Sequence, residues 1–355
     1  MRIEQWQAFK AAAQGARAAR VPVALLVDSP WFPGYAGITH LEYFLDAEAW
    51  FQTNLRFARE FPDAIPFPSW WVEYGMGTEP SAIGARLRFY ADKTPDVSPV
   101  LFRPEDIDQF TPVNPSTDGL MPFVLHLYRT LKQRIFDAGF TVPVVAARGP
   151  LCLAAFVRGI NEFMMDLAES PEAAHRLIRF STETVIRWLG AQAEAIGSSV
   201  EGILVLDDIV GMLSRRMYRE FAHPYLKQIC DAFPPDWVKV YHNDANVKPF
   251  LGDLPDTGFG VLNFSHNVGV AAAHAATGGR MCLMGNVAPL DLGVRGSADE
   301  VKESALRVLR DTDGCGVILS MGGGVSPGTP GENLRALCAA VQDYERDVLP
   351  HPAQV

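Results

Sequence analysis

Residues 202–246 read GILVLDDIVGMLSRRMYREFAHPYLKQICDAFPPDWVKVYHNDAN. Two apolar runs, at 202–206 and 237–241, flank a stretch whose charges and apolar spacing are those of a surface helix. Strands that are apolar on both faces are typical of parallel sheets, because both faces of such sheets are covered. The stretch therefore predicts one strand–helix–strand unit, with polar residues directly after each strand.

The same alternation of short apolar runs and longer helical patterns extends through the chain. The helical patterns include residues 41–61, 170–195, 214–233 and 297–312, and the last three begin with a Ser that is suited to cap a helix. The runs that predict strands lie at residues 22–28, 63–67, 142–147, 202–206, 237–241, 259–263, 281–285 and 316–320. Eight such units predict an α/β protein with a single (β/α)8 TIM barrel over residues 1–355, an N-terminal helix, and a Pro-rich insertion at 70–120 after the second strand. A doubly wound sheet is the alternative, but the GxGxxG motif that often follows its first strand is missing.

The composition restricts the class of protein further. The chain has 355 residues and a formal net charge of −10, which disfavours a nucleic-acid partner because phosphates attract basic surfaces. Its five cysteines include no CxxC pair, so neither a disulfide framework nor a cysteine-rich zinc site is indicated. No secretion signal and no apolar stretch of membrane-spanning length is found, so we expect a cytoplasmic protein without a membrane partner.

The polar residues that follow the predicted strands are candidates for a site, because the carboxyl ends of barrel strands meet at one mouth. His242 and Asp244 lie two apart and so point the same way, and imidazole and carboxylate groups are suitable ligands for zinc or another divalent ion. Asp208, Glu73 or His266 could complete the coordination shell. The alternative is that Asp244 caps the following helix while His242 bonds a neighbour.

Two positions are candidates for acid–base chemistry. One residue of the pair Asp207–Asp208 should face the mouth as a catalytic or ligand-binding group, while the other caps the next turn. Glu73 follows two tryptophans, and apolar surroundings of that kind raise the pKa of a carboxyl group. An ordinary ion pair between Glu73 and Arg86 or Arg88 is the alternative.

Further residues near the strand ends are candidates for binding a substrate. Arg148 follows the third strand and could hold a substrate carboxylate through two parallel hydrogen bonds, or pair internally with Asp28 or Asp208. The other candidates could form an apolar wall, orient the substrate or place backbone N–H groups beside it: they are Trp70, Trp71, Tyr35, Asn286, His266 and Met321, which begins a Met-Gly-Gly-Gly run. Core packing is the alternative for the aromatic side chains.

Five ordered segments carry a family resemblance. They are GPLCLAAFVRG with MDLAESPEAAHRLI (149–159 and 165–178), GILVLDDIVGMLSRRMYREFAHPYLKQI (202–229), YHNDAN (241–246), LMGNVAPLDL with SADEV (283–292 and 297–301), and GVILSMGGGVSPGTPGENLRAL (316–337). In these segments the chain resembles the uroporphyrinogen decarboxylase superfamily, which also contains corrinoid-dependent methyltransferases of the methylcobalamin:coenzyme M type. The resemblance implies a (β/α)8 barrel.

Departures from the family pattern indicate a branch. True uroporphyrinogen decarboxylases have an Arg-rich stretch after the first strand that binds the porphyrinogen carboxylates, whereas VDSPWFPGYAG at 27–37 contains no Arg. The methyltransferase branch holds zinc with a His-x-Cys motif and a later Cys; here His242 matches, but Asp244 and Gly323 stand where the two Cys belong. Oxygen ligands in place of thiolates would suit activation of an ether, hydroxyl or carboxylate oxygen.

The resemblance thus implies a corrinoid-dependent methyltransferase of the O-demethylase type. It would move a methyl group between a small methoxylated or methylated substrate and a corrinoid, with a divalent metal, zinc first among the candidates, on His242 and Asp244. Asp208, Glu73 and His242 would be the catalytic residues, while Arg148 and Asn286 orient the substrate. No DxHxxG corrinoid-binding signature is present, so a separate partner protein would carry the corrinoid. The resemblance is also compatible with a homodimer.

Two other functions remain open at this point. A metal-independent decarboxylase of a small aromatic or tetrapyrrole-like acid would use Asp208 or Glu73 beside a protonated ring, with Arg148 on the carboxylate. A non-catalytic barrel that binds a corrinoid or tetrapyrrole is the third possibility, and the charged residues at most strand ends disfavour it.

Overall fold

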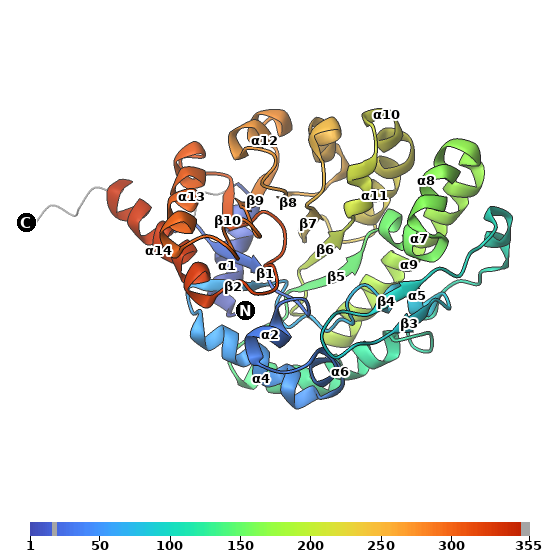
Figure 1. The fold of residues 1–355 in the computed structure, drawn as a ribbon, viewed down its shortest axis with the longest axis horizontal. Helices are drawn as coiled ribbons and strands as arrows, with labels where there is room; N and C mark the ends of the chain where they lie inside the picture. Colours follow the sequence, from blue (N-terminus) through green and yellow to red (C-terminus); the bar gives the residue numbers. More distant parts are fainter. Residues whose placement is uncertain (16–19, 349–355) are drawn as a thin grey trace, which may run out of the picture.

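The computed structural model describes residues 1–15 and 20–348, which form a curled sheet of eight parallel strands surrounded by helices (Figure 1). The strands are β1 (Val23–Leu26), β2 (Ala64–Phe67), β5 (Val144–Arg148), β6 (Gly202–Leu206), β7 (Val238–Asn243), β8 (Val261–Phe264), β9 (Cys282–Val287) and β10 (Val317–Met321). Their order in the sheet is β2-β1-β10-β9-β8-β7-β6-β5, so β2 and β5 are the edges. This is the architecture of a (β/α)8 barrel with a seam between β2 and β5, and all eight predicted strands are confirmed.

The seam between the two edge strands is bridged by hydrogen bonds from residues beside them. The Ser69 hydroxyl, just after β2, donates to the carbonyl of Thr141, just before β5, at 3.2 Å. The Thr141 N–H donates to the Met1 carbonyl at 2.7 Å. Polar groups at the seam therefore find partners without a direct β2–β5 ladder between the described residues.

The helices cover the outside of the sheet and one end of the barrel. They are α1 (Ile3–Ala13), α2 (Phe32–Ala36), α3 (His40–Leu45), α4 (Ala47–Glu60), α5 (Thr78–Ala82), α6 (Met121–Asp137), α7 (Pro150–Arg158), α8 (Ile160–Glu169), α9 (Pro171–Ile196), α10 (Arg215–Met217), α11 (His223–Asp231), α12 (Val270–Thr277), α13 (Ala298–Asp311) and α14 (Gly331–Val348). Short helical turns occupy η1 (Pro104–Gln109), η2 (Asp208–Met212), η3 (Tyr218–Ala222) and η4 (Lys248–Thr257). None of the helices in the described ranges meets the length and hydropathy that crossing a bilayer requires.

Local sequence explains where several of these helices begin and break. The predicted helix at 41–61 is divided because Asp46 accepts hydrogen bonds from two backbone N–H groups of α4, at 2.8 and 3.2 Å. Pro224 has no N–H to donate, and the stretch at 214–233 is correspondingly split into α10, the π-helical turn η3 and α11. Ser297 caps α13 as predicted, whereas the Ser170 side chain makes no capping bond to α9.

The insertion after β2 contains structure that the sequence did not reveal. A two-stranded antiparallel hairpin, β3 (Arg86–Arg88) with β4 (Asp96–Ser98), follows α5 and precedes η1. The first and last residues of each of its strands are exposed, so the hairpin has no strong apolar pattern by which it could be recognised.

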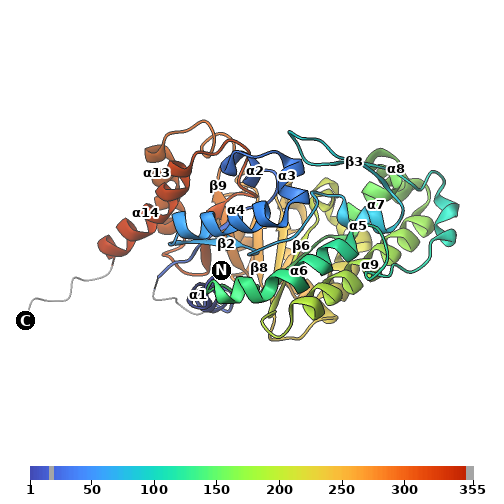
Figure 2. The same cartoon turned by 90° about the horizontal axis from the view of Figure 1, so that it is seen from below.

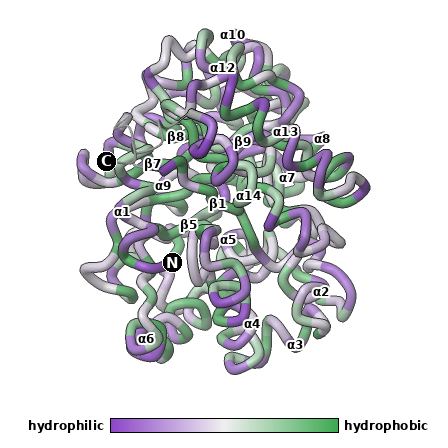
Figure 3. The backbone as a smooth tube through the Cα atoms, turned by 90° about the vertical axis from the view of Figure 1, so that its left-hand side faces the viewer, coloured by the Kyte–Doolittle hydropathy of each residue, from purple (hydrophilic) through white to green (hydrophobic). Residues whose placement is uncertain are grey.

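Alternate residues of each strand face two different apolar layers. The inner layer, inside the barrel, takes residues 24 and 26 of β1, 65 and 67 of β2, 144 and 146 of β5, 204 and 206 of β6, 238 and 240 of β7, 261 of β8, 282 and 284 of β9, and 318 of β10. The neighbouring positions belong to the outer layer, against the helices, and those helices change between hydrophobic and hydrophilic along their length (Figure 3). Trp6 and Phe9 of α1 join the inner layer, and α1 lies at the end of the barrel opposite α2 (Figure 2). The end of the barrel at which α1 lies is thus filled, which leaves the opposite end, the mouth at the carboxyl ends of the strands, for a site.

Candidate active site

Because side chains alternate between the two faces of each strand, every second residue points into the barrel, and at the mouth several of these residues are polar. Two residues beyond the last inner apolar position of a strand stand Asp28 (β1), Arg148 (β5), Asp208 (β6), His242 (β7), Asn263 (β8), Asn286 (β9) and Ser320 (β10). Because strand β7 runs on to Asn243, the next inner position after His242 is Asp244. The same alternation assigns Asp208 to the mouth and the buried Asp207 to the outer layer, between the sheet and the helices. The sequence alone left this choice open.

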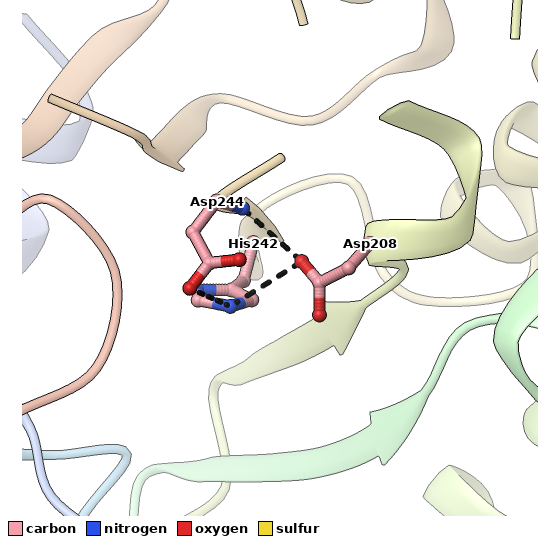
Figure 4. Close-up of side chains that lie close together, drawn as sticks. All are labelled: Asp208, His242 and Asp244. Atoms are coloured by element: carbon pink, nitrogen blue, oxygen red, sulfur yellow. Dashed lines mark hydrogen bonds and ion pairs between the residues drawn. The ribbon is translucent and has the colours of Figure 1, made fainter. Parts of the chain in front are cut away.

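Three of these side chains converge at the ends of β6 and β7 (Figure 4). His242 Nε2 lies 3.6 Å from Asp208 Oδ1 and 4.0 Å from Asp244 Oδ2, and the three ligand atoms all lie within 4.8 Å of one another. The backbone N–H of Asp244 donates to Asp208 Oδ1 at 3.1 Å, which fixes the two carboxylates relative to each other. Burial raises the pKa of Asp244, and the nearby Asp208 adds to this, while His242 opposes it.

The orientation of the His242 ring is set from behind by Asn263. His242 Nδ1 lies 2.6 Å from Asn263 Oδ1, while Asn263 Nδ2 donates to the carbonyls of Met284 and Met321 at 2.8 and 3.4 Å. The amide nitrogen is committed to two acceptors, so its oxygen must accept a hydrogen bond from the Nδ1–H of His242. In its neutral form the ring then directs the lone pair of Nε2 toward Asp208 and Asp244, which is the arrangement found behind metal-binding histidines.

The donor set and its spacing fit a divalent cation. Ligand atoms about 2.1 Å from a tetrahedral metal are about 3.4 Å apart, so the observed separations require only small movements. Asp244 does not cap a helix, because the following helical turn η4 has Val247 at its N-cap. Asp208, His242 and Asp244 are therefore the residues that could hold a metal.

Gly323, in the loop after β10, makes room for the Asp244 carboxylate. A Cβ on Gly323 would lie 2.7 Å from Asp244 Oδ2 and 3.0 Å from Asp244 Cβ, and the backbone there has φ +120°. Both values exclude a side chain at this position unless Asp244 moves. The two positions that depart from the zinc motif of the methyltransferase branch, to which the resemblance was drawn, are therefore linked: Asp244 occupies the space that a residue larger than glycine at 323 would need.

Asp207 has a structural role on the other side of the strand. Its carboxylate accepts hydrogen bonds from the backbone N–H groups of Leu151 and Cys152, at 3.2 and 2.6 Å, in the first turn of α7. It thus caps the helix after the neighbouring strand rather than the next turn of its own chain. Burial raises the pKa of Asp207 to about 7, and Gly149 leaves the space in which the carboxylate sits.

Glu73 is the centre of a second polar group at the mouth. It is buried, and its carboxylate accepts from the backbone N–H groups of Ser29, at 2.9 Å, and of Gly75. Burial, together with the neighbouring Asp28, raises the pKa of Glu73 to about 7. The alternative ion pair is wrong, because none of the ion pairs among the described residues joins Glu73 to Arg86 or Arg88 of the exposed hairpin.

Asp28 belongs to this second group, although sequence reasoning considered it only as a partner of Arg148. Burial raises the pKa of Asp28 to about 6, and the charges of Arg148 and His242 act in the opposite direction. The position two residues beyond Leu26, the last inner residue of β1, was the signal that could have identified it. Glu79, in the insertion, carried no such signal, and its carboxylate accepts from the Arg148 backbone N–H at 2.8 Å.

Arg148 reaches the mouth from the end of β5. Its guanidinium carbon lies 5.4 Å from the centre of the Trp71 ring, and Nη2 donates to the Gly75 carbonyl at 3.3 Å. The internal ion pairs with Asp28 or Asp208 that the sequence allowed are not formed within 4.0 Å among the described residues. Trp71, an inner-layer residue, thus lies beside the predicted substrate-binding arginine.

The remaining predicted substrate-binding residues lie outside this cluster. Trp70 and Met321 each lie next to an inner position and pack in the outer layer. Tyr35 packs there on Trp31, and its hydroxyl donates to Glu60 at 2.7 Å. His266 is exposed in the loop after β8. Asn286 is half-buried, and its side-chain amide donates to the Val268 carbonyl at 2.6 Å.

Comparison with known proteins agrees with this architecture. The family model for uroporphyrinogen decarboxylase (URO-D) matches residues 5–344. The chain belongs to the URO-D family. Uroporphyrinogen decarboxylase of Chlorobaculum parvum is 27% identical over 274 residues, covering 74% of this chain and 76% of the relative. The enzyme of the same name from Thermus thermophilus is 29% identical over 278 residues, covering 76% of both chains.

Solved structures similar to this URO-D family member have the same barrel. A methyltransferase from Methanosarcina mazei superposes with a TM-score of 0.83 at 23% identity, covering 96% of this chain and 98% of the other. A B12-independent methionine synthase from Shewanella sp. W3-18-1 superposes with a TM-score of 0.60 at 12% identity, covering 93% and 99%. At these identities the likeness establishes the fold and no activity.

Proposed function

We propose that this URO-D family member is a corrinoid-dependent methyltransferase of the O-demethylase type. It moves a methyl group between a small methoxylated or methylated substrate and a corrinoid carried by a separate partner protein. The observation that carries the proposal is the convergence of Asp208, His242 and Asp244 at the mouth, with the lone pair of His242 Nε2 turned toward two carboxylates. These three residues would hold a divalent metal, zinc being the first candidate.

The protein side of the mechanism follows from the two polar groups. A divalent cation on Asp208, His242 and Asp244 would polarise the oxygen that bears the methyl group. Asn263 holds the His242 ring in the orientation that this role needs. Glu73, whose pKa of about 7 leaves part of it protonated at neutral pH, can hold the proton that a leaving oxygen takes up. The apolar inner layer beneath the mouth excludes water from below.

The comparisons support two different branches. The Methanosarcina mazei structure is a methyltransferase, which favours the proposal, while the sequence relatives are named uroporphyrinogen decarboxylases. Those names and the buried carboxyls of Asp28 and Glu73 favour a second candidate, a metal-independent decarboxylase of a small acid. The absence of any Arg in VDSPWFPGYAG disfavours a substrate with many carboxylates in either case.

Metal analysis combined with activity separates the two candidates. Purified protein should contain about one equivalent of divalent metal, and His242→Ala should lose it, because three ligands are the fewest that hold zinc in known catalytic sites. The matched control is His126→Ala, which removes an exposed imidazole on α6, outside the cluster. Methyl transfer from a methoxylated probe to cob(I)alamin, followed by absorbance, should stop on chelation and return with zinc.

The two candidates give opposite results in this assay. Methyl transfer that persists in full after the metal is removed would contradict the metal role. Release of CO2 from a small acid by metal-free protein, without any methyl transfer, would establish the decarboxylase instead.

A further inference from the structure

We propose that Arg148 forms a carboxylate-binding subsite in the mouth, so that the substrate is a small methoxylated carboxylic acid held at two points. This inference rests on the proposed function for the methoxy end of the substrate. The carboxylate end rests on the contacts of Arg148 alone, and the two can be tested separately.

The Arg148 guanidinium is buried without a counter-charge in contact. The residue is 6% exposed, and its Nε has no hydrogen-bond partner. Within the described part of the chain, its side chain makes one hydrogen bond, the 3.3 Å contact to the Gly75 carbonyl, and no carboxylate lies within 4.0 Å. A buried charge without a paired partner is costly, and a planar carboxylate matches the free N–H edge of a guanidinium. An anionic ligand group would complete this site.

Two carboxyl groups near Arg148, those of Glu73 and Glu79, accept hydrogen bonds from backbone donors. Glu73 accepts from the N–H groups of Ser29 and Gly75, and Glu79 accepts from the backbone N–H of Arg148 itself at 2.8 Å. Arg148 lowers the pKa of both carboxyls, but burial outweighs it and the net direction is upward. Neither carboxylate contacts the guanidinium among the described residues, so the Arg148 Nε–H is left without an acceptor.

The register of the sheet sets the distance between the two binding points. Arg148 pairs with Leu206 across β5 and β6, and Leu206 pairs with His242 across β6 and β7. Arg148 and His242 therefore stand in one row, both facing the mouth, two strand spacings or about 10 Å apart at Cα. A substrate that reaches from one to the other needs its carboxylate and its methoxy group at opposite ends of a short rigid spacer. We expect two groups on adjacent atoms of a ring to span this separation less well.

Calorimetric binding of three benzoic acid derivatives, without corrinoid, tests the subsite. The probes are 4-methoxybenzoate, its neutral analogue 4-methoxybenzamide, and 2-methoxybenzoate, whose two groups are adjacent. We expect the native protein to bind 4-methoxybenzoate about 10- to 100-fold more tightly than the amide, because the charge-assisted pair is lost in the amide. We expect 2-methoxybenzoate to bind more weakly than the 4-isomer.

Variants identify the residue responsible. Arg148→Gln should remove the preference for carboxylate over amide, and Arg148→Lys, which keeps the charge without the planar fork, should retain only part of it. Arg216→Gln removes an equal charge from a side chain that is 85% exposed and should leave the preference unchanged. The thermal unfolding temperature of each variant shows whether it is folded, and the ratio of the two ligands within one protein does not depend on the fraction folded.

Each outcome decides the inference. A native protein that binds carboxylate and amide equally, or binds neither, overturns the subsite even if the Arg148 variants do not fold. An unchanged preference in Arg148→Gln overturns it too. Carboxylate preference that depends on Arg148, without methyl transfer to any corrinoid, retains the subsite and contradicts the proposed function. Methyl transfer without a carboxylate preference retains the proposed function and contradicts the subsite.

Discussion

Substitution of Gly323 by alanine should weaken metal binding, because the new methyl group would displace the Asp244 carboxylate. The Cβ would lie 2.7 Å from Asp244 Oδ2 and 3.0 Å from Asp244 Cβ, closer than such atoms approach in proteins. The backbone at φ +120° adds strain of about 1–3 kcal/mol for a residue other than glycine. Misplacing an oriented ligand typically reduces metal affinity about 10- to 100-fold, and we expect a loss of this size.

Gly324 provides the matched control. A Cβ there would meet only Leu26, at 3.8 and 3.9 Å, which is ordinary contact. Zinc affinity, measured by competition with a chromophoric chelator, should fall in Gly323→Ala and stay near the native value in Gly324→Ala. In an Asp244→Gly background, adding Gly323→Ala should cause no further loss of zinc affinity, since both the carboxylate and the Cβ of residue 244 are gone. Native zinc affinity in Gly323→Ala would refute the link between the two positions.

Three further predictions concern the carboxyl groups and the histidine. Asp208→Asn should lower zinc affinity about tenfold or more with little loss of stability, whereas Asp207→Ala should keep the zinc and lower the free energy of unfolding by about 1–3 kcal/mol; the reverse pattern would contradict the assignment of the two residues. Asn263→Leu should leave the His242 Nδ1–H without its acceptor and reduce zinc affinity about 10- to 100-fold in the same titration; an unchanged value would show that the ring needs no such support. The pKa of Glu73 rises from 4.5 to about 7 on folding, so the folded protein binds the extra proton and the stabilisation is lost as pH rises through 7. The free energy of unfolding, measured with urea from about pH 5 to about pH 8, should therefore fall less in Glu73→Gln than in the native protein, by at most about 3 kcal/mol. An equal fall in both proteins would contradict the buried proton.

The eight strands could be predicted because parallel barrel strands are buried on both faces and so form short, continuous apolar runs. The hairpin β3–β4 could not, because its residues alternate only between exposed and half-exposed positions. Helix breaks at Asp46 and Pro224 depend on single residues within long apolar patterns, and whether such a residue divides a helix is decided by the packing around it.

Within the site, sequence identified His242, Asp244 and Asp208 because all three follow strand ends. It did not distinguish mouth-facing from outward-facing neighbours, since a strand that is apolar on both faces gives no alternation by which its phase can be read. Met321 and Trp70 were placed at the mouth for this reason, although they pack in the outer layer. The inner and outer positions become visible only when the curled sheet separates the two apolar layers.

The sequence by itself determined the number and order of the strands and the residue types that the mouth has to offer, because burial on both faces leaves a local apolar signature. It also placed Asp244 and Gly323 where the resemblance to the methyltransferase branch implies two cysteines. Only the tertiary structure decided that these two substitutions occupy one another's space, that Asn263 orients His242, and that Arg148 is buried without an ion-pair partner in the described residues. Those relations join strands far apart in the chain, and the distances and free donors that define them arise only when the sheet curls and its strand ends meet.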